Sequence, residues 1–197
     1  MRILNLYAGI GGNRKLWGDE HEITAVEIDP EIAKIYQDFF PNDKVIVGDA
    51  HQYLLEHFEE FDFIWSSPPC PTHSKIRKVF SNQNGPVYPS MDLYQEILLL
   101  KGYFKGKWVV ENVVGWYDPL IPAQTYKQHY YWSNFIILGE KNSFRGHFAG
   151  NEELQQIKGF DLSSYQIDKN KALRNCVEPE AGLSIFKMAF KEKQVTL

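Results

Sequence analysis

Two side chains in this sequence of 197 residues have surroundings that suit a chemical reaction, one cysteine and one glutamate. Cys70 follows Pro68 and Pro69, which restrict the backbone, and a basic segment comes after it. That setting favours an accessible thiolate beside cations, which is a strong nucleophile, over a small buried cysteine. Glu111 directly follows the apolar run 108–110. Unless it forms an ordinary ion pair, we expect its carboxyl group to point into the space beyond a strand and to hold or donate a proton there.

A glycine-rich segment and two later acids indicate a second kind of site, for a cofactor with an adenosyl group. Gly9, Gly11 and Gly12 follow a strand-like run and precede a helix, so the backbone can turn tightly and approach a ligand. Glu27 ends the next strand-like run, where an acid can accept hydrogen bonds from both ribose hydroxyls. Asp49 ends the third, where it could meet an adenine edge. These acids could instead cap tight turns. Because the pattern recurs at three successive strand ends, we favour a cofactor site.

A nucleophilic thiolate, a proton-holding glutamate and an adenosyl cofactor together suit one known chemistry. Carbon C5 of cytosine is not nucleophilic on its own. If a thiolate adds to C6 while an acid holds N3, C5 becomes an enamine carbon that can attack an activated methyl group. Loss of the C5 proton and expulsion of the thiolate then restore the ring.

The order of the predicted elements indicates how these residues come together. Strands are expected at residues 2–7, 23–28, 45–47, 61–65 and 107–110, with 129–138 extended, and helices begin near Pro30, His51, Ser90 and Pro179. This alternation predicts an α/β fold with a Rossmann-like, doubly wound, mostly parallel sheet. Ligands of such sheets bind at the carboxyl ends of the strands.

Charge is unevenly distributed along the chain, whose formal net charge is −4. Residues 1–71 carry 13 acids and 5 bases, residues 72–147 carry 9 bases and 5 acids, and residues 148–197 are balanced. A basic stretch with interleaved aromatics can bind a polyanion, although a solvated charged face would look the same. No apolar run reaches the roughly 20 residues of a membrane span. The two cysteines provide neither a disulfide framework nor a four-thiolate zinc site, so we expect a cytoplasmic protein without a metal.

Taken in order, these motifs resemble those of the C5-cytosine DNA methyltransferases of bacterial or phage type. Residues 5–12 resemble the Phe-Ala-Gly-x-Gly-Gly motif, 68–74 the Pro-Cys loop, 110–113 the Glu-Asn-Val motif and 173–177 the closing motif. The resemblance implies the class I methyltransferase fold, with S-adenosyl-L-methionine as cofactor and S-adenosyl-L-homocysteine as product. The implied cofactor residues are Tyr7, Ala8, Gly9, Ile10, Gly11, Gly12, Glu27, Ile28, Asp49, Ala50, Ser67, Pro69, Leu93, Asn175, Cys176 and Val177.

The same resemblance implies methylation of a cytosine that is flipped out of double-stranded DNA. Its catalytic residues would be Pro69, Cys70, Glu111, Asn112, Lys127 and His129, and its nucleic-acid contacts Ser74, Lys75, Arg77, Lys78, Lys127 and His129. The family pattern differs at Pro71, where glutamine is common. It also differs at the family's Gln-x-Arg-x-Arg motif. One alignment of the sequence with that motif places Thr125, Lys127 and His129 at its three named positions, and an alignment that starts from Gln128 places Tyr130 and Trp132 at the two arginine positions.

We expect residues 1–138, completed by 173–197, to form the catalytic domain and 139–172 a reduced target-recognition region. A tRNA cytosine methyltransferase is the main alternative, but residues 71–74 lack the Cys-Phe-Thr signature of that branch. A homodimer, or a subunit that needs a recognition partner, is a further alternative because the recognition region is short. A non-catalytic subunit and a nicotinamide-binding protein fit less well, since neither explains both Pro-Pro-Cys and Glu-Asn-Val.

Overall fold

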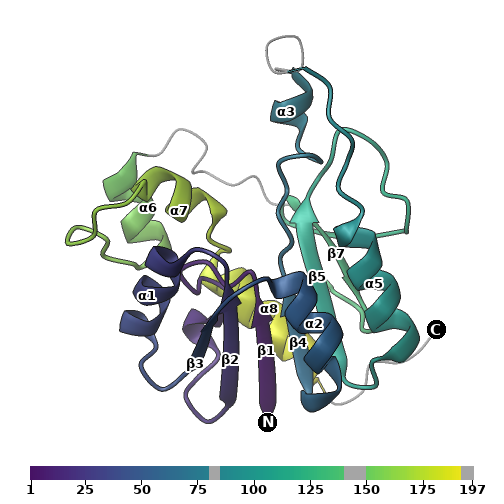
Figure 1. Ribbon diagram of the computed structural model, residues 1–197, viewed down its shortest axis with the longest axis horizontal. Coiled ribbons are helices and arrows are strands. Elements are labelled where there is room, and N and C mark those ends of the chain that lie inside the picture. Colours follow the sequence, from purple (N-terminus) through teal and green to yellow (C-terminus); the bar gives the residue numbers. More distant parts are fainter. Residues whose placement is uncertain (80–84, 140–149, 192–197) are drawn as a thin grey trace.

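Seven strands form one sheet in the computed structural model, which describes residues 1–79, 85–139 and 150–191 (Figure 1). The strands are β1 (Arg2–Leu6), β2 (Glu22–Glu27), β3 (Lys44–Val47), β4 (Phe63–Ser66), β5 (Lys107–Val113), β6 (Gln124–Tyr126) and β7 (His129–Ser133). Their order is β3-β2-β1-β4-β5-β7-β6. The first five are parallel, and β7 is antiparallel to both of its neighbours. The predicted doubly wound, mostly parallel α/β sheet is therefore confirmed.

Helices connect the strands and cover both faces of the sheet. They are η1 (Arg14–Leu16), α1 (Pro30–Phe39), α2 (Ala50–His57), η2 (Phe58–Glu60), α3 (Lys75–Val79), α5 (Asp92–Tyr103), α6 (Asn151–Lys158), α7 (Lys169–Asn175) and α8 (Pro179–Ala189). Asp29 and Asp49 begin α1 and α2, because each side chain accepts hydrogen bonds from two backbone N–H groups of the first turn. None of the helices in the three described ranges is long and apolar enough to cross a membrane.

Alternation along the central strands divides the core into two layers, because successive side chains point to opposite faces. Ile3, Trp65 and Val109 contribute to the layer beneath α8. Leu4 and Ile64 contribute to the layer beneath α2 and α5. Both faces of β4 are buried, which explains its continuous apolar run.

The C-terminal helices α6 and α7 lie beside α1 (Figure 1). Leu154, Phe160 and Leu173 form a buried cluster with Ile35 of α1 and Ile10 of the glycine-rich segment. Residues 150–172 thus have a packing role, whatever role they have in recognition. The predicted recognition region 139–172 lies partly outside the described residues, at 140–149, and its function stays a prediction.

Two predicted strand boundaries differ from the observed ones by three residues or more. The extended segment predicted at 129–138 ends as a strand at Ser133. Strand β5 continues to Val113 instead of ending at residue 110. The cause is the antiparallel strand β7, which pairs with residues 109–113 and keeps them extended. Glu111 therefore lies within a strand and not beyond its end.

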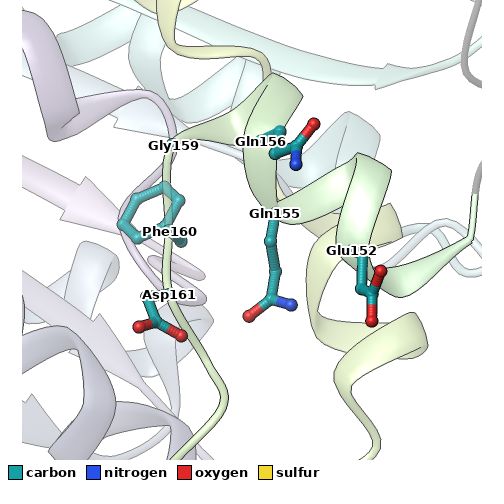
Figure 2. Close-up of a pocket in the computed structure, with 6 residues that line it drawn as sticks. All are labelled: Glu152, Gln155, Gln156, Gly159, Phe160 and Asp161. Atoms are coloured by element: carbon teal, nitrogen blue, oxygen red, sulfur yellow. The ribbon is translucent and has the colours of Figure 1, made fainter.

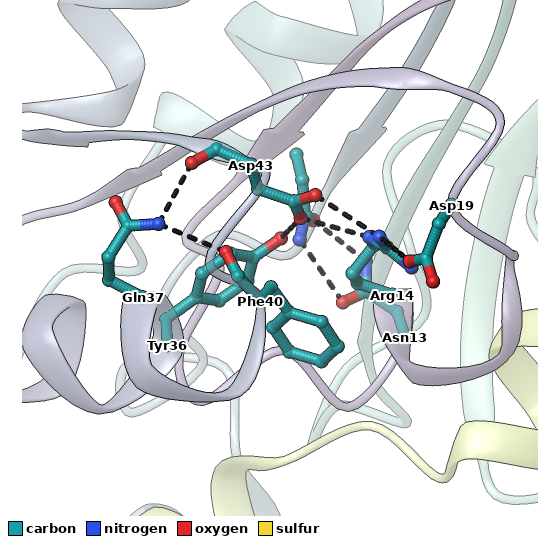
Figure 3. A network of polar contacts seen from close by, with 8 residues as sticks. Asn13, Arg14, Asp19, Tyr36, Gln37, Phe40 and Asp43 are labelled. Atoms are coloured by element: carbon teal, nitrogen blue, oxygen red, sulfur yellow. Dashed lines mark hydrogen bonds and ion pairs between the residues drawn. The ribbon is translucent and has the colours of Figure 1, made fainter.

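A buried polar network fixes the segment after the glycines (Figure 3). Arg14 is 2% exposed, and its guanidinium donates to both carboxylate oxygens of Asp43, with N–O distances of 2.9 and 3.1 Å. The Tyr36 hydroxyl donates to the same carboxylate at 2.8 Å, and Asp19 accepts a further bond from Arg14 at 3.0 Å. These bonds join η1 to α1 and to the turn before β3, so they support the strand ends around the glycines.

Replacing Asp43 by alanine should destabilise the fold by about 3–5 kcal/mol, because it leaves the Arg14 charge buried without its main partner. That is a large part of a typical total of about 5–15 kcal/mol. Asp19→Ala is the matched control. It removes a carboxylate from the same arginine, but the Asp19 side chain is 81% exposed, so we expect about 1 kcal/mol or less. Urea denaturation of both variants measures the difference, and equal losses would contradict the assigned role of Asp43.

Candidate active site

The turn that carries Cys70 follows β4 and is held from two sides. The Asn112 side chain, 2% exposed, donates to the Pro68 carbonyl oxygen at 2.9 Å. The Cys70 carbonyl oxygen accepts from the backbone N–H groups of His73 at 2.9 Å and Ser74 at 3.1 Å. The predicted residues Cys70 and Asn112 are thus brought together although they are far apart in the sequence. The bond also gives Asn112 a definite structural task, which is to fix the position of the turn that carries Cys70.

The electrostatic surroundings of Cys70 differ from those expected. Burial raises the pKa of the Cys70 thiol, and the negative charge of Glu111 raises it further. The prediction of a thiolate stabilised by neighbouring cations is therefore wrong for this state of the protein. The basic residues of α3 follow Cys70 in sequence, but Lys75 and Lys78 are exposed on a helix that projects from the strand ends (Figure 1). The resting form of Cys70 is the thiol.

Glu111 is 8% exposed and lies opposite Tyr131 in the β5–β7 pair. Nε2 of His129, at the start of β7, lies 3.5 Å from a carboxylate oxygen of Glu111. The antiparallel hairpin therefore places His129 beside the predicted proton-holding group. His129 remains 43% exposed at its side chain, so the pair faces the exterior from the histidine side.

Lys127 lies close to His129 in sequence, but its side chain contacts a different carboxylate. It lies in the turn between β6 and β7 with φ of 51°, a conformation that is unfavourable for residues other than glycine. Its ammonium group forms an ion pair with Glu178, the residue that precedes α8. The structure thus brings His129, but not Lys127, into contact with Glu111. Lys127 connects the hairpin to the C-terminal helix.

The glycine-rich segment approaches the closing segment of the chain closely. A side chain at Gly12 would collide with Cys176 Sγ and the Val177 carbonyl oxygen, so only glycine fits there. Gly9 has φ of 54°, and a Cβ atom there would meet no atom within 4 Å. The predicted cofactor residues at the two ends of the chain therefore lie together, with open space in front of Gly9.

Comparison with known proteins decides the family. A model described as C-5 cytosine-specific DNA methylase matches residues 1–119, more than half of the chain. The chain belongs to this family. S-adenosyl-methionine is the methyl donor of the family, and it is accordingly the cofactor of this methylase. The family predicted from the sequence motifs is confirmed.

Curated relatives of this methylase include enzymes named for tRNA. The tRNA (cytosine(38)-C(5))-methyltransferases of Rattus norvegicus and Homo sapiens are 28% and 27% identical to it over 82 residues, or 39% of the chain. The match spans 21% of the length of each relative. Among solved structures, a Spodoptera frugiperda DNMT2 variant is 25% identical with a TM-score of 0.41, covering 57% of this chain and 35% of that one. A putative DNA modification methyltransferase of an Escherichia coli prophage is 21% identical with a TM-score of 0.39, covering 58% and 32%.

The residues at the ends of β1, β2 and β3 fit an adenosyl group. Glu27 accepts the Gly9 N–H at 2.9 Å and the Asp29 N–H at 3.0 Å, which fixes its carboxylate beside the glycine turn. Next to it, the apolar side chain of Ile28 is 69% exposed, a surface that an adenine ring could cover. Asp49 uses one carboxylate oxygen to cap α2. Binding of an adenosyl group at this edge requires space, an acid and an apolar surface. Gly9, Glu27 and Ile28 provide them in that order.

The structure also places four further predicted cofactor residues, which are Leu93, Ser67, Cys176 and Asn175. Leu93 is 3% exposed and packs in the layer beneath α2 and α5. Ser67 accepts the Trp65 indole N–H at 2.9 Å. Burial raises the pKa of the Cys176 thiol to about 11, so this cysteine is protonated and serves packing. Asn175 ends α7 and is exposed.

Sequence reasoning missed a buried carboxylate beside the cofactor residues, Glu96 on α5. Its side chain is fully buried and accepts from the Tyr7 hydroxyl and the Ser66 hydroxyl, each at 2.6 Å, and His51 Nδ1 lies 3.0 Å away. This contact raises the pKa of His51. The sequence does contain an indication of this buried carboxylate, because Glu96 lies three residues after Leu93 and therefore on the apolar face of the helix. Glu96 connects the ends of β1 and β4 with the start of α2.

A cavity of about 420 Å³ lies on α6 and the turn after it, far along the sequence from the catalytic motifs (Figure 2). Its lining residues are Glu152, Gln155, Gln156, Gly159, Phe160 and Asp161. None of the predicted catalytic or cofactor residues is among them. Within the described residues, no three histidine, cysteine or carboxylate side chains are grouped as a metal ion would require.

Proposed function

We propose that this chain is a DNA cytosine-5 methyltransferase that acts on a cytosine flipped out of the duplex. The observation that carries the proposal is the grouping of Cys70, in the turn after β4, with Glu111 and Asn112 of β5. Strand β4 pairs with β1, which leads into a glycine segment suited to an adenosyl group. Neither C5 nor C6 can be attacked while the base is stacked, so flipping is part of the proposal.

In the proposed reaction, Cys70 loses its proton to solvent and its sulfur bonds to C6, while Glu111 in its protonated form delivers its proton to N3. The ring electrons then make C5 nucleophilic. When bound, S-adenosyl-methionine supplies an electrophilic methyl group, which C5 accepts, and S-adenosyl-L-homocysteine is the leaving group. C5 finally loses its proton to solvent, and the electron pair of that bond forms the C5–C6 double bond. The bond between sulfur and C6 breaks with its electron pair returning to sulfur, and N3 returns its proton to Glu111. Asn112 holds the Cys70 turn, and His129 orients the Glu111 carboxylate through its contact with Oε1.

The basic helix α3 supports binding of a polyanion close to this centre. Lys75 and Lys78 are exposed, and Nζ of Lys78 lies 5.0 Å from the centre of the Trp116 ring. The helix follows the nucleophile turn after four residues, so cations on it can contact the backbone phosphates that flank a flipped base.

Replacing Lys75 and Lys78 together by glutamine should weaken DNA binding at all sequences alike and lower the salt dependence. Each lost phosphate contact reduces the slope of log K against log salt by about 0.9. We therefore expect a decrease of up to about 2 in that slope for the double variant. Lys101→Gln, an exposed lysine on α5, is the control and should change neither. Fluorescence anisotropy at several salt concentrations measures the slope, and loss of binding to one sequence alone would mean that α3 reads bases.

A second candidate substrate is tRNA, because the curated relatives carry that name. Incubating the chain with labelled S-adenosyl-methionine and either duplex DNAs or tRNAs, followed by mapping of 5-methylcytosine, distinguishes the two. Label in DNA supports the proposal, and label in tRNA alone overturns it in favour of the second candidate. Label that appears only after addition of a cell extract indicates a recognition partner. DNA modification within a restriction system or a mobile element is the biological role that we propose for the DNA activity.

A further inference from the structure

His73, three residues after Cys70, is a buried histidine that the proposed reaction does not use. It is 3% exposed, and its Nδ1 lies 2.7 Å from the Tyr117 hydroxyl oxygen. Its other ring nitrogen, Nε2, is buried and has no hydrogen-bond partner among the described residues. His73 and Asn112 line the same cavity of about 10 Å³. Asn112 is the residue that holds the Cys70 turn from the other side. Burial lowers the pKa of His73, so the ring is neutral.

A series of hydrogen bonds leads to this ring from the backbone of the loop before β6. The Leu120 N–H, which can only donate, bonds to the Tyr94 hydroxyl oxygen at 3.2 Å. The Tyr94 hydroxyl in turn donates to the Tyr117 oxygen at 3.3 Å. Each of the two tyrosine hydroxyls has one hydrogen. If both hydrogens form hydrogen bonds, the Tyr94 hydrogen goes to the Tyr117 oxygen, and the Tyr117 hydrogen goes to Nδ1 of His73. A neutral ring that accepts at Nδ1 carries its hydrogen on Nε2.

The same loop holds the backbone of the nucleophile turn. The Trp116 N–H donates to the His73 carbonyl oxygen at 3.1 Å, and the Trp116 indole donates to the Thr72 carbonyl oxygen at 3.2 Å. Ser74 forms an isolated antiparallel bridge with Gly115. His73 itself donates its N–H to the Cys70 carbonyl oxygen at 2.9 Å. Residues 115–117 follow the strand that carries Glu111, so they connect the positions of the nucleophile and the glutamate.

Stability alone does not account for an imidazole at this position. A phenylalanine ring would occupy a similar volume without placing an unpaired nitrogen in the interior, and unpaired buried polar groups are destabilising. What the imidazole adds is an acceptor for Tyr117, and hence a fixed orientation of the turn that begins at Cys70. We propose that His73, held by Tyr117 and Tyr94 in the tautomer with hydrogen on Nε2, is a positioning residue that sets Cys70 relative to Glu111. This inference rests on the proposed role of Cys70.

Tyr117→Phe tests the inference most directly, because it removes one hydroxyl and keeps the ring. We expect the rate of covalent adduct formation with DNA that contains 5-fluorocytosine to fall about 10-fold, since small misplacements of reacting groups have effects of this order. The dissociation constant for S-adenosyl-methionine should not change. Tyr88→Phe, at a tyrosine that is 96% exposed, is the matched control and should react like the wild type. His73→Phe should show the same loss without lower thermal stability, and His73→Asn, whose amide oxygen can accept from Tyr117, should recover part of it.

Nitrogen-15 NMR of the histidine rings provides a readout that does not depend on activity. The wild type should show His73 with hydrogen on Nε2, and Tyr117→Phe should change that signature. A wild-type ring with hydrogen on Nδ1 overturns the inference, as do normal adduct rates in Tyr117→Phe and His73→Phe. A loss of adduct that only follows a loss of cofactor binding or of thermal stability overturns it as well. If the wild type forms no adduct with DNA or tRNA, the proposed function fails, whereas the NMR result still decides how the His73 ring is held.

Discussion

Replacing Cys70 by serine or alanine should abolish methyl transfer, lowering the rate by roughly four orders of magnitude or more, because the thiolate proposed to bond to C6 is lost. A serine hydroxyl at this site would be a far weaker nucleophile than a thiolate. Transfer of label from S-adenosyl-methionine to DNA measures the loss. Both variants should bind the cofactor with an unchanged dissociation constant, since Cys70 lies on the β4 side of the site and the glycine segment is intact. A variant that methylates at the wild-type rate refutes the mechanism.

The proposed covalent bond between the Cys70 sulfur and C6 can be detected directly. DNA that contains 5-fluorocytosine should form a stable adduct with the wild type in the presence of cofactor, since fluorine cannot leave as a proton. The adduct should survive denaturing electrophoresis and should be missing for Cys70→Ala. An adduct that forms equally well with Cys70→Ala would assign the nucleophile to another residue.

Replacing Glu111 by glutamine should move two measurements in opposite directions. Methyl transfer should fall by about 10²–10⁴-fold, because the general acid that serves N3 is lost. Alkylation of Cys70 by iodoacetamide near neutral pH should become faster. The Glu111 charge raises the pKa of the Cys70 thiol, so its removal lowers that pKa and increases the thiolate fraction at a given pH. The alkylation profile of the variant should therefore lie at lower pH than that of the wild type.

Glu178→Gln is the matched control for the alkylation experiment. Glu178 is a second carboxylate of the site region, but it is paired with Lys127 and is not among the groups that shift the Cys70 pKa. Its removal should leave the alkylation profile of Cys70 in place. Mass spectrometry of the peptide that contains Cys70 separates its alkylation from that of Cys176. Slower alkylation in Glu111→Gln would mean that Glu111 acts on the thiol as a base and not as a fixed negative charge.

The raised pKa of Cys70 changes how the active site must work. The sequence context indicated a thiolate ready to react, but in the structure the thiol is half-buried and close to a carboxylate. Loss of the Glu111 charge would remove one of the two causes of the raised pKa of the Cys70 thiol. Burial and the Glu111 charge together disfavour the thiolate form of Cys70.

Much of the fold could be predicted because its determinants are local. The α/β alternation follows from apolar periodicity within short windows, and Asp29 and Asp49 act as helix caps through residues two and three positions away. The glycine turn likewise depends on its own backbone angles. The order of the motifs was sufficient to predict the family, and Cys70, Glu111 and Asn112 are residues of those motifs.

The tertiary structure alone decided which groups act on these residues. Strand β7 keeps Glu111 inside the sheet and places His129 beside it, and Lys127 is paired with Glu178, 51 positions away. Burial and charge at a site come from segments that meet only in the folded chain, and for that reason no local pattern indicated the raised pKa of Cys70 or the bond between His73 and Tyr117. The sequence thus determined which residues are proposed to react. Long-range packing determined their orientation and the raised pKa of Cys70, because desolvation and Coulomb interactions depend on distance in space and not along the chain.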